Sequence, residues 1–122
     1  MLQKKVRGSE EKIKTVGDCC GTPSSSTGPS SGHGGSGYYY YTETSSPRVE
    51  GDVFELAYDG SACAAQGLVV GEVSFYYSMY GGTMGTLSVV DARGAEVWSL
   101  GGNQGDGWQL DSVGLYTGSF TF

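Results

Sequence analysis

Long apolar runs are missing from this sequence, and basic residues are scarce over most of it. No stretch approaches the roughly 20 apolar residues that a transmembrane helix requires, so we expect no transmembrane segment in this chain. After Lys14 only Arg48 and Arg93 remain against eleven acidic residues, and the formal net charge of the chain is −6. A surface that follows a phosphate backbone needs clustered Lys and Arg side chains. We therefore expect no nucleic-acid binding by the acidic folded part of the chain.

Residues that bind metals or support a nucleophile are also few. The three cysteines, Cys19, Cys20 and Cys63, do not show the Cys-x-x-Cys spacing of a zinc site, and the single histidine, His33, does not complete one. His33 lies in a Gly-Ser segment that offers no rigid support for a catalytic triad. We expect it to anchor that segment through a structural hydrogen bond. No Gly-x-x-x-x-Gly-Lys motif opens onto a helix, which excludes a phosphate-binding loop of that kind.

Four carboxylates could be considered for glycoside hydrolysis: Glu43, Glu55, Asp91 and Glu96. The chemistry needs two carboxyl groups about 5 to 9 Å apart, and nothing in the sequence brings two of these together. We interpret all four as solvated strand residues. The sequence predicts no catalytic residues, so the protein is not expected to be an enzyme.

The beginning of the chain differs in composition from the rest. Residues 1–16 hold five of the seven basic residues and lack the apolar segment of a signal peptide, so no export signal is visible. We expect this segment to be a charged, disordered tail. Residues 17–37 are mostly Gly, Ser, Thr, Pro and Cys and are predicted to form a loop. Residues 38–122 are expected to form one folded domain.

The stretch from Val73 to Val90 is expected to organise that domain. Apolar or aromatic side chains alternate with polar ones, which is typical of strands with one face in the core. A glycine-rich turn over 81–85 separates two such strands and predicts a β-hairpin with a longer loop. The side chains predicted for the core are Phe75, Tyr77, Met79, Leu87, Val89, Trp98 and Trp108.

Further strands are predicted from aromatic and β-branched residues between turn signals. They cover residues 38–44, 53–58, 95–100, 108–115 and 118–122. Roughly seven short strands at fairly regular spacing indicate an all-β protein, an antiparallel two-sheet β-sandwich or jelly roll.

Several segments together resemble the MAM domain family, in order and near the expected spacing. The upstream segments are Thr22 to Pro29, His33, Gly35 to Tyr39 and Thr42 to Thr44. The downstream segments are Phe75 to Gly81, Gly85 to Val89, Trp98, Gly102 to Gly105, Trp108, Val113 and Leu115. The resemblance covers residues 22–122, and linked motifs in one order are far more specific than any single motif.

The resemblance implies a jelly roll that serves as a non-catalytic adhesion or recognition module in extracellular and cell-surface proteins. The expected partner is a protein or glycan at a cell surface, and this chain is expected to be part of a longer protein. The family's closing Asp-rich strand is not seen, so we expect residues 38–122 to be a domain incomplete at its C-terminus. An incomplete sandwich leaves backbone groups unpaired, which predicts self-association.

Two features of the family bear on cofactors and disulfides. Some members bind calcium or sodium through acidic residues in regions that differ here, where Gly32 replaces the usual Asp and the charged tail replaces a Cys-Gly-Trp region; no cofactor is expected. The family's oxidising compartment implies a disulfide between Cys63 and either Cys19 or Cys20. Free thiols, or a metal or redox role for them, remain the alternatives.

Tyr76 and Tyr80 are the candidate ligand-binding residues, because alternation places them on the face opposite Phe75. An exposed aromatic pair on a concave sheet would favour sugar, whereas a broad, flat polar face would favour protein. The alternative function is therefore a carbohydrate-binding jelly-roll module attached to a hydrolase. A decayed reading frame with no function of its own is a third possibility.

Overall fold

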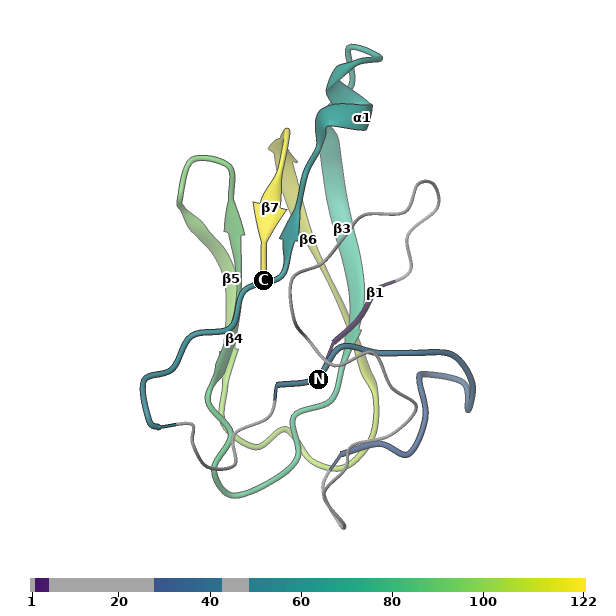
Figure 1. The fold of residues 1–122 in the computed structure, drawn as a ribbon, viewed down its shortest axis with the longest axis vertical. Helices are drawn as coiled ribbons and strands as arrows, with labels where there is room; N and C mark the ends of the chain where they lie inside the picture. The colour runs from purple at the N-terminus through teal and green to yellow at the C-terminus, as the bar shows by residue number, and fades with distance from the viewer. Residues whose placement is uncertain (1, 5–27, 43–48) are drawn as a thin grey trace.

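The computed structural model describes residues 2–4, 28–42 and 49–122. This part of the chain forms seven strands and one single-turn helix (Figure 1). The elements are β1 (Leu2–Lys4), β2 (Ala57–Tyr58), α1 (Ser61–Ala64), β3 (Val70–Tyr77), β4 (Thr86–Asp91), β5 (Glu96–Gly101), β6 (Gln109–Thr117) and β7 (Phe120–Thr121). Within the described ranges, no helix is long and apolar enough to span a membrane.

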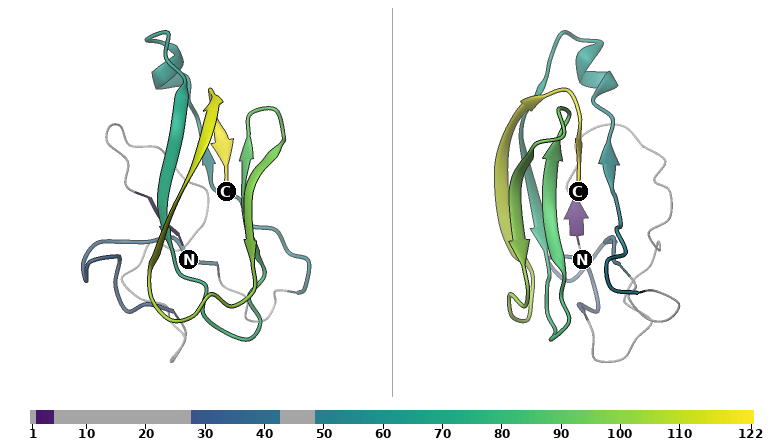
Figure 2. Two further views of the ribbon diagram at one scale, coloured as in Figure 1. Left: turned by 180° about the vertical axis from the view of Figure 1, so that it is seen from behind. Right: turned by 90° about the vertical axis from the view of Figure 1, so that its left-hand side faces the viewer.

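The strands form two antiparallel sheets. One sheet has the order β1-β3-β6 and the other has the order β2-β7-β4-β5. In the left view of Figure 2, β3 and β6 lie to one side and β4 and β5 to the other. The expected all-β, antiparallel two-sheet sandwich is confirmed.

The segment from Val73 to Val90 does not form the expected hairpin. Strand β3 pairs with β1 and β6, whereas β4 pairs with β5 and β7 in the other sheet. The glycine-rich connection over 78–85 therefore crosses between the sheets. The expectation was wrong because alternation reports which side chains face the core, not which strands are neighbours. Two strands that face each other across a sandwich show the same pattern as two neighbours in one sheet.

The strand expected over 38–44 is also wrong in its described part. Tyr39 and Tyr40 make only isolated bridge pairs, and residues 43–44 lie outside the described ranges. The strand expected over 53–58 is reduced to β2, which continues through a reciprocal pair of backbone hydrogen bonds of 3.0 and 2.9 Å between Leu56 and Phe122.

Strand β1 was not expected, because it belongs to the segment interpreted as a charged tail. Leu2 lies opposite Tyr77 and Lys4 lies opposite Phe75, so β1 extends the sheet on the free side of β3. The remainder of that segment, residues 5–16, lies outside the described residues.

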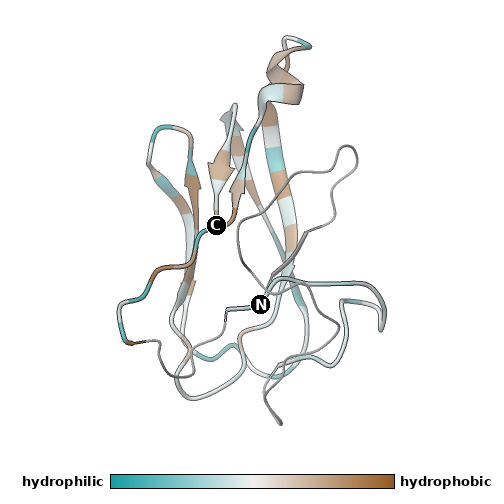
Figure 3. Ribbon diagram, viewed as in Figure 1, coloured by the Kyte–Doolittle hydropathy of each residue, from teal (hydrophilic) through white to brown (hydrophobic). Residues whose placement is uncertain are grey.

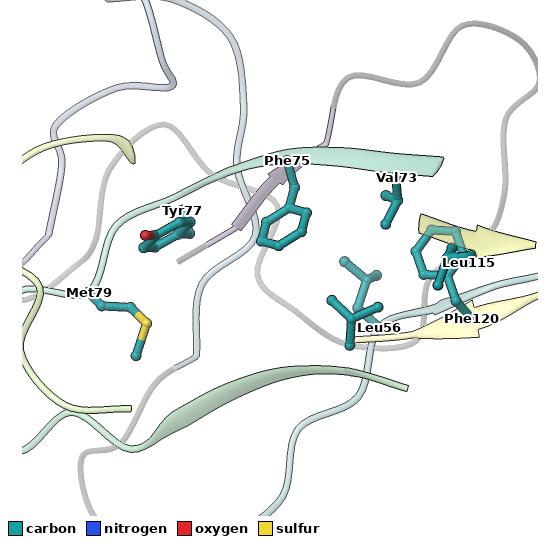
Figure 4. Packing of buried hydrophobic residues seen from close by; sticks show 8 residues of the cluster. Leu56, Val73, Phe75, Tyr77, Met79, Leu115 and Phe120 are labelled. Carbon is teal, nitrogen blue, oxygen red and sulfur yellow. The ribbon is translucent and has the colours of Figure 1, made fainter. Parts of the chain in front are cut away.

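The core lies between the two sheets. Its buried side chains are Leu56, Val73, Phe75, Tyr77, Met79, Val89, Leu115 and Phe120. Figure 3 shows the alternation of hydropathy along β3, and Figure 4 shows Val73 and Phe75 pointing from β3 toward Leu56. Leu87 and Trp98 are half-buried and pack against this cluster, and Trp108 is half-buried outside it.

Phe75 is the centre of an aromatic cluster that joins the sheets. Its side chain is only 1% exposed, and its ring meets Trp98 and Phe122 edge-on with centroid separations of 5.0 Å in both cases. Edge-to-face contacts of this kind add to the free energy gained from burial. Trp98 belongs to β5 and Phe122 follows β7, so one side chain of β3 contacts two segments of the opposite sheet.

Polar groups at the edge of this cluster are paired. Trp98 Nε1 donates a hydrogen bond of 2.9 Å to Asp111 Oδ2, which links β5 to β6 across the sandwich. The Tyr77 hydroxyl donates to Gln109 Oε1 at 3.2 Å. Burial, and secondarily the nearby Asp111 carboxylate, raise the pKa of Tyr77, which further favours the protonated hydroxyl that donates this hydrogen bond.

Asp91 shapes the turn between β4 and β5. Its Oδ1 accepts from the backbone N–H groups of Arg93 and Ala95 at 2.8 and 3.0 Å. Its Oδ2 accepts from Arg93 Nε and Nη2 at 2.9 and 2.6 Å. Both carboxylate oxygens are thus used, and the hydrogen bonds from Arg93 hold the pKa of Asp91 below its ordinary value.

A close approach of two chain segments fixes the position of α1. A Cβ atom on Gly60 would lie 1.4 Å from the Gly118 carbonyl oxygen, so no other residue can occupy position 60 without moving the chain. Gly60 also supplies the carbonyl that accepts from the backbone N–H groups of Cys63 and Ala64 in α1.

Replacing Phe75 by Ala should lower the free energy of unfolding by about 3 to 5 kcal/mol, because it empties the centre of the aromatic cluster. Denaturant unfolding measures this loss. Leu110→Ala is the control: Leu110 is 60% exposed, and its truncation should stay within about 0.5 kcal/mol. Similar losses for both variants would contradict the assignment of the inner and outer faces.

Asp91→Asn should destabilise the protein at neutral pH, because the amide cannot form the ion pair with Arg93. The folded-state pKa of Asp91 is depressed, so the advantage of the carboxylate should be complete above its ordinary pKa of 3.8. This stability advantage over Asp91→Asn should disappear as the pH falls through the lower folded-state pKa of Asp91. Denaturant unfolding over a pH series measures this difference.

Arg93→Gln in the Asp91→Asn background provides the control for that series. The ion pair is already absent in this background, so the second substitution should lower the free energy of unfolding little further. A difference between wild type and Asp91→Asn that stays constant over the acidic range would show that the ion pair contributes nothing.

Candidate functional site

The outward side chains of β3 and β6 form an open surface, which we call the outer face. Its paired positions are Glu72 with Gly114, Ser74 with Ser112, and Tyr76 with Leu110. All except Tyr76 are exposed. Strand alternation produces this surface, because the same two strands direct Val73, Phe75 and Leu115 into the core.

One end of the outer face is covered by the segment 28–37. The His33 ring stacks on the Tyr76 ring with a centroid separation of 3.7 Å and an interplanar angle of 12°. Trp108 Nε1 donates a hydrogen bond of 3.0 Å to the carbonyl oxygen of Ser31. These contacts hold a Gly-Ser segment without regular secondary structure against the sheet.

Tyr39 supports the same segment from its other end. Its hydroxyl donates to the carbonyl oxygen of Pro29, and its ring meets Trp108 edge-on with a centroid separation of 5.4 Å. Tyr39 is only 2% exposed. Residues 28–37 are therefore attached to the buried Tyr39 and the half-buried Trp108 as well as to the outer face.

The two candidate ligand-binding tyrosines occupy different environments. Tyr76 is half-buried against His33, whereas Tyr80 is 44% exposed in the connection between β3 and β4. His33 anchors its segment by ring stacking on Tyr76. The outer face accordingly presents no exposed pair formed by Tyr76 and Tyr80.

Of the four carboxylates considered for hydrolysis, the three that the structure describes lie in different environments. Asp91 is buried in the β4–β5 turn with both oxygens engaged. Glu96 is exposed in β5, Glu55 is exposed ahead of β2, and Glu43 lies outside the described residues. Among the described side chains, no group of three His, Cys, Asp or Glu residues is arranged to hold a metal ion.

Cys63 lies in α1 and is half-buried, with its Sγ 3.8 Å from the Tyr58 hydroxyl. It is a free thiol in this structure. Both of its expected partners, Cys19 and Cys20, lie outside the described ranges, so the disulfide stays a prediction.

A cavity of about 460 Å³ lies beside β4, away from the outer face. It is lined on one side by Thr86, Leu87 and Ser88 of β4 and on the other by residues 52–56, with Tyr40 and Tyr41 contributing to its wall. Strand β7 pairs with β4 only at Val90 and Asp91. The cavity therefore continues the line of β7 along a part of β4 that no described strand covers on that side.

Sequence reasoning did not select Tyr116, the most exposed aromatic side chain on β6, with 80% of its surface exposed. It has a φ of 54°, the only positive φ among the described non-glycine residues. Alternation along 109–117 places it outward, but its backbone conformation depends on the pairing with β3, which no local pattern reveals.

Comparison with known proteins identifies the family. The family described as MAM domain, meprin/A5/mu, matches residues 12–122. MAM domain-containing glycosylphosphatidylinositol anchor protein 1 of Gallus gallus is 39% identical over 95 residues, which are 71% of this chain and 10% of that protein. The Homo sapiens protein of the same name is 38% identical over 104 residues, covering 74% of this chain and 10% of the relative.

A relative that is not named as an anchor protein matches the chain at a similar level of identity. Neuropilin-1a of Danio rerio is 34% identical over 112 residues, which are 76% of this chain and 10% of that protein. The chain thus spans about a tenth of the length of these relatives. No solved structure matches it. From the match over residues 12–122 and the two-sheet jelly-roll fold, this chain belongs to the MAM domain family.

Proposed function

We propose that this domain is a non-catalytic extracellular adhesion or recognition module that binds a cell-surface protein through its outer face. The observation that carries the proposal is the open surface of β3 and β6, where Glu72, Ser74 and Ser112 are exposed. The same face also presents the exposed side chain of Leu110, and protein interfaces combine apolar side chains with a polar rim in this way.

The support for a cell-surface location comes from the relatives. Two of them are named as glycosylphosphatidylinositol anchor proteins that contain MAM domains. A non-catalytic role agrees with the positions of the carboxylates, since Asp91 is occupied by Arg93 and by backbone donors. Glu55 and Glu96 are exposed on separate segments.

A carbohydrate-binding module is less well supported. Sugar rings stack on exposed aromatic faces, and the Tyr76 ring is already stacked against His33. Tyr80 lies in the connection between the sheets rather than on the outer face. We therefore propose a protein partner and treat glycan binding as an outcome that the experiment distinguishes.

The proposed location is oxidising, so we retain the prediction that Cys63 pairs with Cys19 or Cys20 when the protein is secreted. Cys63 is half-buried in α1 and carries a free thiol in this structure. Mass mapping of the secreted, non-reduced protein should find one of these two pairs. Alkylation of all three thiols without prior reduction would rule the pairing out.

Ser112→Arg should abolish binding of a multimerised domain to cells, because it places a large charged side chain in the middle of the outer face. Flow cytometry on a panel of cell lines measures the binding. Ser99→Arg is the matched control: Ser99 is exposed on β5 of the other sheet, so this variant should bind as wild type does.

Pretreatment of the cells separates the two kinds of partner. Loss of binding after mild trypsin treatment, with retention after removal of surface glycans, would support a protein partner. Loss only after glycan removal would favour the carbohydrate-binding alternative. Equal effects of Ser112→Arg and Ser99→Arg, or no binding to any cell type, would contradict a recognition role for the outer face.

A further inference from the structure

A β-bulge distorts the end of the outer face opposite the segment 28–37. The register between β3 and β6 shifts between Val70, which pairs with Thr117, and Glu72, which pairs with Gly114. Leu115 and Tyr116 therefore share the space opposite the single residue Gly71. Leu115 is 3% exposed and Tyr116 is 80% exposed, so within the bulge one side chain faces the core and the other faces outward.

The bulge holds Tyr116 in a conformation that non-glycine residues seldom adopt. Its φ of 54° lies in the left-handed region, which is unfavourable for a residue with a Cβ atom. Such strain persists only where the surrounding structure imposes it, and it is concentrated at functional positions. The buried neighbour Leu115 and the pairing of Thr117 with Val70 fix the chain on both sides of Tyr116.

The Tyr116 ring lies over a glycine and beside a carboxylate. A Cβ atom on Gly114 would be 3.1 Å from Cε2 of Tyr116, so the ring covers the place of a side chain at position 114. Glu72 is the cross-strand partner of Gly114, and directly opposed positions on one face have Cβ atoms about 4.5 to 5.5 Å apart. The ring and the Glu72 side chain are therefore neighbours on the outer face.

Glu72 is a carboxylate that a neighbouring hydroxyl group orients. Its Oε1 accepts a hydrogen bond of 3.3 Å from Ser74 Oγ, and the side chain is exposed. Within residues 28–42 and 49–122, Arg93 is the single Lys or Arg residue, and its guanidinium pairs with Asp91 at the β4–β5 turn. Lys4, the other described basic residue, lies opposite Phe75 rather than Glu72 in the register of β1 with β3.

We propose that Tyr116 and Glu72 form a binding site for an arginine side chain of the partner protein. The guanidinium would stack on the Tyr116 ring while its N–H groups pair with the Glu72 carboxylate. Guanidinium groups favour both interactions, because they are planar, weakly hydrated and able to donate in parallel to a carboxylate. The proposal rests on the recognition role proposed for the outer face and specifies the chemistry of the partner.

The experiment titrates N-acetyl-arginine-N-methylamide into the isotopically labelled protein and follows the backbone amides by NMR. Saturable shifts are expected at residues 71–74 and 114–117. Tyr116→Asn removes the ring and keeps a residue that tolerates the left-handed region. Glu72→Gln removes the charge. Each should weaken binding about two- to fivefold, and the double variant should abolish the saturable shifts.

Two controls make the result specific. Glu96→Gln changes the net charge of the protein by the same amount as Glu72→Gln, but it lies on β5 of the other sheet. This variant should bind the probe as wild type does. The citrulline analogue of the probe keeps the shape but lacks the charge, and it should not produce saturable shifts. The thermal midpoint of Tyr116→Asn should not fall below that of wild type, which separates loss of the ring from loss of folding.

The proposal is overturned if shifts at these residues do not saturate up to the solubility limit of the probe. Equal weakening by Glu96→Gln and Glu72→Gln, or equal binding of the citrulline analogue, would overturn it as well. None of these outcomes affects the cell-binding comparison of Ser112→Arg with Ser99→Arg. Failure of the arginine site is therefore distinguishable from failure of the recognition role.

Discussion

The contact of Phe75 with Trp98 and Phe122 is the interaction on which the rest of this structure depends. It joins one strand of the three-stranded sheet to two segments of the four-stranded sheet with centroid separations of 5.0 Å. Hydrophobic burial provides most of the free energy of folding in a chain of this size. Once β3 is fixed by this contact, alternation directs Glu72 and Ser74 outward. The outer face is thus a consequence of how the core is packed.

A second set of aromatic residues connects the irregular part of the chain to this scaffold. His33 stacks on Tyr76, and Trp108 and Tyr39 hold the backbone of residues 28–37. Tyr76 and Tyr77 are consecutive residues of β3 and point to opposite faces. Tyr77 therefore packs in the core, whereas Tyr76 contacts residues 28–37. Glycine and serine alone could not order that segment, since they bury little apolar area.

The sequence predicted those parts of the fold that depend on local periodicity. The side chains of Val73, Phe75 and Tyr77 are buried as their alternation indicates. Strand pairing was not predictable, because the pattern is the same for neighbours in one sheet and for strands across a sandwich. The hairpin expectation failed for this reason, because the two strands belong to different sheets. The environment of Tyr116 was hidden for a related reason, since the bulge lies between the pairs Glu72–Gly114 and Val70–Thr117, whose members are 42 and 47 positions apart in sequence.

The bulge at Leu115 and Tyr116 also affects how this domain tolerates other chains. Strand β6 is at the end of its sheet in the described part of the chain, and a straight edge of this kind offers unpaired N–H and C=O groups to any extended polypeptide. A left-handed residue interrupts that row, because its peptide groups no longer alternate in the direction that a new strand requires. The residue that displays an exposed aromatic ring on the outer face therefore also opposes aggregation through edge-to-edge pairing.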